Sequence, residues 1–157
     1  MKELVYIETT IVSYLTARPT RDMVIAAHQE LTRQWWNSRA SAFDLLVSEL
    51  VREEAAMGDP EAAKNRLDII DQIPILKVTN TAVELANHLV SVGLVPTGSA
   101  ADALHIAITA VNGVNYLLTW NCKHLANAIL RFRIEEMVEG SGFNCPIICT
   151  PEELMEE

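Results

Sequence analysis

The stretch LVYIETT, residues 4–10, passes from four apolar side chains to a carboxylate and two hydroxyls. A short apolar run bounded by polar residues is typical of a strand that is buried on both faces. Glu8 follows the run directly, so its carboxylate lies where the predicted strand ends. At that point a carboxylate reaches solvent and a ligand without entering the core.

Similar apolar runs recur along the chain and predict the rest of the fold. Further strands are expected at residues 45–47, 75–78, 116–118 and 146–149. Stretches with apolar residues near the helical period lie at residues 22–38, 49–57, 60–70, 81–92, 99–111 and 125–138. Strands separated by such helices predict a three-layer α/β/α fold with a central, mainly parallel sheet of four to five strands. We expect one domain, residues 1–157.

The net charge of -9 is unevenly distributed along the chain. Residues 134–157 hold seven carboxylates and no Lys or Arg, whereas residues 1–133 are close to neutral. A strongly acidic protein is an unusual partner for nucleic acid, because that affinity comes largely from basic side chains. The near-neutral body of this chain leaves a nucleic-acid partner open.

The sequence also indicates a compartment. No apolar run reaches the roughly 18 residues of a membrane-spanning helix, and the N-terminus lacks the features of a signal peptide. We therefore expect a cytoplasmic protein with no membrane partner. The three cysteines lack metal-ligand spacing, which predicts reduced thiols rather than disulfides or a zinc site.

Polar side chains follow three of the predicted strands. Glu8 follows the first strand, Ser48 follows the second, and Thr119 and Asn121 follow residues 116–118. The carboxyl ends of parallel strands share one edge of a sheet, and ligands bind in the crevice outside it. We therefore expect these side chains to converge.

Asp102 belongs to the same predicted site. It opens a helix that is apolar nearly all round, so the first turn of this helix is expected deep in the protein, pointing toward Glu8. Carboxylates gathered at a buried edge repel one another unless a cation compensates them. A hard divalent ion such as Mg²⁺ or Mn²⁺ is the natural compensator, because it takes oxygen ligands.

Each of these residues, taken singly, also has a structural interpretation. Glu8 and the two threonines after it suit a helix start, where a carboxylate meets the positive end of the dipole. Ser99 followed by Asp102 matches a capping box, and Asn121 suits a turn.

Two histidines lie near the candidate residues. His105 is three residues after Asp102 and shares its helix face. A hydrogen-bonded core histidine is the favoured interpretation of His105, and a catalytic base is the alternative. His124 is interpreted as structural or RNA-facing rather than catalytic.

With these motifs in this order, the chain resembles the PIN-domain family, in particular the VapC-like toxins of bacterial toxin-antitoxin pairs. That family opens with a strand ending in an acidic residue and Thr or Ser, matched by residues 8–9. A strand ending in Ser with a Glu six residues on is matched by Ser48 and Glu54. An Asp-Ala-Leu helix start is matched by residues 102–104, and a strand ending in Thr-x-Asp by residues 119–121.

The resemblance implies a metal-dependent endoribonuclease that cleaves RNA phosphodiesters with a metal-activated water. Its cofactor would be Mg²⁺ or Mn²⁺. The residues matched to catalytic positions are Glu8, Glu54, Asp102 and Asn121, of which the first three would bind the metal directly or through water. The residues matched to supporting positions are Thr9, Ser48 and Thr119.

The resemblance further implies partners. They are an RNA substrate, a cognate antitoxin protein and a second copy of the chain in a homodimer. Trp35 and Trp36 would belong to the helix that carries the protein contacts.

Two departures from the family pattern motivate an alternative function. Glu8 stands where the family usually has Asp, and Asn121 removes one negative charge. The alternative is a catalytically weakened PIN-like protein that acts as a binding or assembly module. A flavodoxin-like or receiver-type domain also places acidic residues at strand ends, but here its phosphorylatable Asp and partner Lys are not found.

Overall fold

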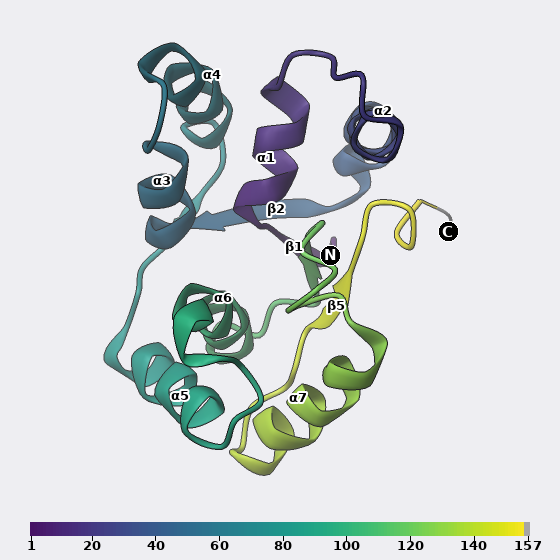
Figure 1. Ribbon diagram of the computed structural model, residues 1–157. Coiled ribbons are helices and arrows are strands. Elements are labelled where there is room, and N and C mark those ends of the chain that lie inside the picture. The colour runs from purple at the N-terminus through teal and green to yellow at the C-terminus, as the bar shows by residue number, and fades with distance from the viewer. Residues whose placement is uncertain (156–157) are drawn as a thin grey trace.

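The computed structural model describes residues 1–155 and is built around a five-stranded sheet (Figure 1). The strands are β1 (Leu4–Ile7), β2 (Asp44–Ser48), β3 (Ile75–Leu76), β4 (Tyr116–Leu118) and β5 (Ile147–Cys149). Their order is β3-β2-β1-β4-β5, and every neighbouring pair is parallel. The predicted α/β fold with a parallel sheet is therefore confirmed.

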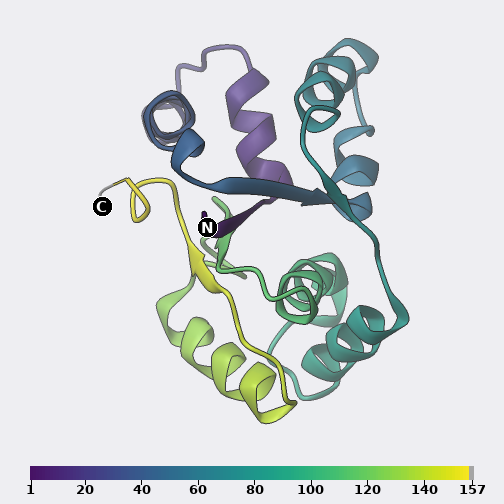
Figure 2. The ribbon, with the colours of Figure 1, turned by 180° about the vertical axis from the view of Figure 1, so that it is seen from behind.

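Helices cover both faces of the sheet. They are α1 (Thr9–Thr16), α2 (Met23–Ser38), α3 (Glu49–Ala55), α4 (Pro60–Ile70), α5 (Asn80–Ser91), α6 (Ala100–Val111) and α7 (Ala128–Gly140). Helices α1 to α4 lie on one face, and α5 to α7 lie on the other (Figures 1 and 2). No helix within residues 1–155 is long and apolar enough to span a membrane.

The central strand shows why its sequence does not alternate between apolar and polar residues. Val5, Tyr6 and Ile7 are all completely buried, because helices cover both faces of β1. Helix α6 is buried along most of its length as well, from Ala103 to Ala110 apart from Leu104. Strand β1, which Glu8 follows, and helix α6, which contains Asp102, are thus both largely buried.

Strand connectivity creates the crevice in which a ligand would bind. From β1 the chain continues to β2 on one side, and after β3 it returns to β4 on the other side of β1. Strand order therefore reverses at the carboxyl end of β1, which is the usual position of a ligand site in an open α/β sheet. Glu8 lies at this point.

The structure corrects two predicted boundaries and one predicted helix cap. The strand expected at 75–78 ends at Leu76, and the Val78 amide donates instead to Glu49 Oε1 at 2.8 Å. The helix expected from residue 125 begins at Ala128, because Asn127 Oδ1 caps it. The capping box at Ser99 is wrong, since the Ser99 side chain makes no capping bond.

The tryptophans of α2 differ in environment. Trp35 is fully buried, and its Nε1 donates to the Leu154 carbonyl at 3.1 Å. Its ring stacks on Phe43 with a centroid separation of 6.0 Å. Trp35 is therefore a core residue, and of the pair only Trp36 is partly exposed for a partner.

Candidate active site

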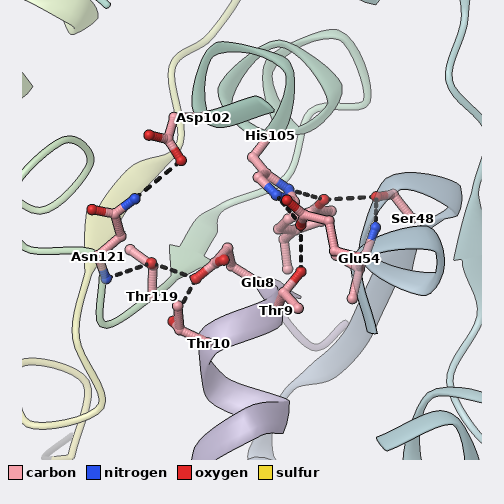
Figure 3. Close-up of polar contacts among 11 residues, drawn as sticks. Glu8, Thr9, Thr10, Ser48, Glu54, Asp102, His105, Thr119 and Asn121 are labelled. Carbon is pink, nitrogen blue, oxygen red and sulfur yellow. Dashed lines mark hydrogen bonds and ion pairs between the residues drawn. The ribbon is translucent and has the colours of Figure 1, made fainter. Parts of the chain in front are cut away.

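Glu8 lies where β1 meets α1, and its carboxylate is held by hydroxyl groups. Only 5% of the residue is exposed. Oε1 accepts hydrogen bonds from Thr119 Oγ1 at 2.6 Å and from Thr10 Oγ1 (Figure 3). Although Glu8 occupies the position before α1, its side chain makes no capping bond to that helix. The carboxylate is therefore oriented toward the strand ends, and Oε2 accepts no bond from residues 1–155.

Glu54 reaches the same edge from α3. Its Oε1 accepts hydrogen bonds from Thr9 Oγ1 at 2.6 Å and from His105 Nε2 at 2.8 Å. Oε2 of Glu54 likewise accepts no bond from the described chain. Burial on its own raises the pKa of the Glu54 carboxyl, but the hydrogen bonds that it accepts from His105 and Thr9 together lower the pKa below its ordinary value. Glu54 is therefore ionised at neutral pH.

The fold brings these two glutamates together with a histidine. One ligand atom each from Glu8, Glu54 and His105 lie within 4.8 Å of one another, and the described residues contain no other such acidic or histidine group. The three residues come from β1–α1, α3 and α6, which are distant in sequence (Figure 3). We call Glu8 and Glu54 the glutamate pair.

Asp102 and Glu54 lie on opposite sides of Glu8 (Figure 3). Asp102 Oδ1 accepts from Asn121 Nδ2, and Asp102 Oδ2 accepts from His124 Nδ1, both at 3.0 Å. The backbone N–H of Asn121 donates to Thr119 Oγ1 at 2.9 Å, and Thr119 Oγ1 in turn donates to Glu8. Asp102 is thus linked to Glu8 through two residues but lies outside the group that contains the glutamate pair. A direct metal bond from Asp102 stays a prediction.

His105 and Tyr6 form a buried layer behind Glu54. His105 is 1% exposed, and both of its ring nitrogens have partners. Tyr6 Oη lies 2.6 Å from His105 Nδ1 and 2.7 Å from Ser48 Oγ. The sequence predicts only a strand position for Tyr6. A tyrosine hydroxyl within an otherwise aliphatic strand needs a polar partner when it is buried. That requirement could have indicated a buried hydrogen bond from Tyr6 to a neighbouring element.

Two further residues near the site have structural partners. Arg52, the nearest cation to Glu54 in sequence, forms an ion pair with Asp71. Trp120 is 7% exposed, its Nε1 donates to Thr32 Oγ1 at 2.7 Å, and its ring stacks on His28 at 4.0 Å. Arg52 is thus engaged with Asp71, and His28 covers one face of Trp120.

The geometry defines the class of protein: a parallel α/β domain with a pair of carboxylates at the point where strand order reverses. No family model and no curated protein matches the sequence. Solved structures do match the fold. A chain of the VapBC2 structure from Rickettsia felis, bound to a DNA fragment from its promoter, has a TM-score of 0.58 at 16% identity, covering 94% of this chain and 98% of that one.

A second solved structure gives the same result. VapC20 from Mycobacterium tuberculosis, a toxin that cleaves the sarcin-ricin loop, has a TM-score of 0.58 at 14% identity, covering 90% of this chain and 99% of that one. The chain therefore has a PIN-domain, VapC-like fold over most of its length.

Proposed function

We propose that the protein is a metal-dependent endoribonuclease of the VapC-like toxin type. The observation that carries this proposal is the glutamate pair, assembled from distant segments at the reversal of strand order. The fold likeness supports it, because VapC20 is an RNA-cleaving toxin. Mg²⁺ or Mn²⁺ is the proposed cofactor.

The donor chemistry of the pair fits a hard divalent cation. In each glutamate Oε1 takes both protein hydrogen bonds, while Oε2 takes none from residues 1–155. An ionised carboxylate has about four lone-pair positions, so Oε2 of Glu8 and Oε2 of Glu54 remain as oxygen ligands. A protein usually contributes one or two carboxylates to a Mg²⁺ site, and waters fill the other coordination positions.

The remaining site residues have distinct proposed roles. When bound, the ion would activate a water and stabilise charge on the phosphodiester. Thr119 and Thr9 fix the Oε1 atoms of the glutamate pair and so fix the direction of the free oxygens. Asp102, with Asn121 donating to it, adds negative charge at the same edge and is proposed to contact the ion directly or through water.

An RNA cleavage assay tests the proposal. We expect the protein to cut a single-stranded RNA or a sarcin-ricin hairpin in the presence of Mg²⁺ or Mn²⁺, and to stop when a chelator is added. Glu8→Gln, Glu54→Gln and Asp102→Asn keep the shape of each side chain but remove its charge. Each should lower the rate by more than about 100-fold, since loss of partners outside the ligands already costs about 10- to 100-fold.

Glu53→Gln is the matched control, because Glu53 is exposed on the same helix as Glu54. This variant should cleave at the wild-type rate. Full activity of the Glu8→Gln and Glu54→Gln proteins, or activity that survives chelation, would contradict the proposal.

A second candidate function is a binding or assembly module without catalysis. Asn121 favours it, because its Nδ2 is a donor to Asp102 and its Oδ1 accepts from the His124 amide at 3.2 Å. The fourth acidic position of the family pattern thus carries no charge. Calorimetric titration separates the two functions: the nuclease binds Mn²⁺ below millimolar concentration, and the module leaves the site empty while folded.

The proposed partners are those that the family resemblance implies. A VapC-like toxin in the cytoplasm would be held inactive by a cognate antitoxin and would act as a homodimer. The VapBC2 structure contains a toxin-antitoxin pair of this kind. Co-expression with the product of a neighbouring small reading frame, followed by co-purification, tests the antitoxin.

A further inference from the structure

The buried layer behind the glutamate pair suggests what His105 does. Its Nε2 lies 2.8 Å from Glu54 Oε1, and its Nδ1 lies 2.6 Å from Tyr6 Oη. The ring packs edge-on against Tyr6, with centroids 5.7 Å apart and planes at 62°. Both the position and the orientation of the imidazole are therefore fixed from two sides.

The directions of these hydrogen bonds identify the tautomer. An ionised carboxylate only accepts hydrogen bonds, so Nε2 must carry a proton and donate it to Glu54. At the other end, the Val51 amide donates to Ser48 Oγ at 3.2 Å. If Ser48 then donates to Tyr6, and Tyr6 donates to Nδ1, every group in this row of hydrogen bonds has a partner while the imidazole is neutral. The row runs from the Val51 amide to Glu54.

The opposite direction is less satisfactory. If Nδ1 also carried a proton and donated to Tyr6, the ring would be an imidazolium. Tyr6 would then donate to Ser48, and the Ser48 hydroxyl would accept two bonds. Its own proton would then find no acceptor within the described chain, although Ser48 is fully buried. Tyr6 is completely buried as well, and its phenol hydroxyl has a proton to donate. The row thus favours a single tautomer, with the proton on Nε2.

The simplest interpretation of the three-residue group is that Glu8, Glu54 and His105 all bind one metal ion. This tautomer is incompatible with that interpretation. His105 lies close enough to the glutamate pair to share an ion, but the Nε2 lone pair is occupied by its proton. We propose that His105 is a positioning residue and not a metal ligand: its Nε2–H, fixed by Tyr6, binds Glu54 Oε1 and leaves Oε2 to the cation. The inference rests on the cation site of the proposed function and specifies its protein ligands as oxygen atoms alone.

Mn²⁺ affinity measured without RNA tests the positioning role. His105→Leu removes the donor, and the dissociation constant for Mn²⁺ should rise about 10- to 100-fold, the usual effect of losing a partner of a metal ligand. His105→Gln keeps a terminal N–H and should recover most of the affinity. His88→Gln, on an exposed face of α5, is the control and should leave the constant unchanged.

The tautomer has its own spectroscopic test. Nitrogen-15 NMR of histidine-labelled wild type should show one ring that stays in the Nε2–H form when Mg²⁺ is added. In Tyr6→Phe the Nδ1 resonance should shift, because Nδ1 loses the hydrogen bond that it accepts from Tyr6, while Nε2 keeps the proton that it donates to Glu54. A ring that loses the Nε2 proton on metal addition would overturn the inference.

Pulsed electron paramagnetic resonance of the Mn²⁺-loaded wild type needs no variant and therefore does not depend on how variants fold. We expect no modulation from a directly coordinated imidazole nitrogen. Strong nitrogen modulation that disappears in His105→Gln would make His105 a ligand and overturn the inference.

The outcomes separate this inference from the proposed function. If Mn²⁺ binds and the variants follow the expected order, but no RNA is cut, only the nuclease proposal fails. If RNA is cut while His105→Leu binds Mn²⁺ like the wild type, only the positioning role fails. A wild type that binds no Mn²⁺ overturns both.

Discussion

Two threonines that are neighbours in sequence hold two different glutamates. Thr10 bonds Glu8 within the same turn, whereas Thr9 reaches Glu54, which is 45 residues away. Hydrogen bonds to an ionised acceptor are roughly twice as strong as those between neutral groups. The two hydroxyls therefore fix both carboxylates from the first turn of one helix. Removing the charge of Glu54 should therefore lower the free energy of unfolding measurably.

The lowered pKa of Glu54 predicts a pH-dependent stability in the absence of metal. In the unfolded chain this carboxyl titrates near its ordinary value of 4.5, and in the folded protein its pKa is lower. The folded state therefore binds fewer protons between these two values, so the contribution is present above 4.5 and is lost as the pH falls through the folded pKa.

Urea unfolding between about pH 3 and 6 measures this contribution. The difference in unfolding free energy between wild type and Glu54→Gln should shrink as the pH decreases. Glu53→Gln, on the exposed face of α3, should show no such change. A difference that stays constant over the range would contradict the assigned role of His105 and Thr9 in lowering the pKa.

The Ser48 hydroxyl bonds both α3 and β1. Its removal should lower the unfolding free energy more than the loss of an ordinary helix cap does. Ser48 Oγ accepts from the Val51 amide, which caps α3, and it also bonds Tyr6 in the interior. Loss of a cap costs about 1 kcal/mol, and leaving a buried polar group without a partner costs about 1–3 kcal/mol. We predict that Ser48→Ala lowers the unfolding free energy by about 2–4 kcal/mol.

Thr79→Ala is the control for this measurement in denaturant. Thr79 caps α5 in the same way but is exposed and has no partner in the core. It should cost about 1 kcal/mol. Equal losses for the two variants would show that the bond from Ser48 to Tyr6 contributes nothing.

At the scale of elements, α6 connects the two halves of the site. Asp102 in its first turn bonds Asn121 and His124, and His105 three residues later bonds Glu54. The sequence pattern predicted this helix and its burial, because residues 102–108 are apolar nearly all round. It did not predict that Asp102 and His105 would bond different parts of the site, since that depends on where the fold places Glu54 of α3 and Asn121 after β4.

The small residues of α6 predict a sharp packing constraint. Ala103 and Ala107 are completely buried, four residues apart on one face of the helix. Ala107→Leu adds three carbon atoms to a filled interior, and we expect it to lower the unfolding free energy by about 1–3 kcal/mol. Ala101→Leu, which is exposed in the first turn, should change it by less than about 0.5 kcal/mol. Thermal or urea unfolding of both variants checks the difference.

At the scale of the whole molecule, connectivity rather than local pattern assembles the site. The apolar runs predicted a mainly parallel sheet of four to five strands, and the ends of three strands predicted where polar groups would gather. The sequence did not determine that β1 lies between β2 and β4, because strand neighbours are set by how the crossover helices pack. Contacts such as His105 with Glu54, 51 residues apart, depend on that order and have no local signal.

Because the glutamate pair is completed only when the sheet is assembled, a cation bound there should stabilise the whole fold. The unfolded chain separates Glu8 from Glu54, so it should bind the ion poorly. At Mn²⁺ concentrations 100 times the dissociation constant, the unfolding free energy should rise by about 2.7 kcal/mol. Glu8→Gln should abolish this increase, and Glu53→Gln should retain it. Residues 134–157 hold seven further carboxylates. The same stabilisation in Glu8→Gln as in the wild type would place the ion there instead of at the reversal of strand order.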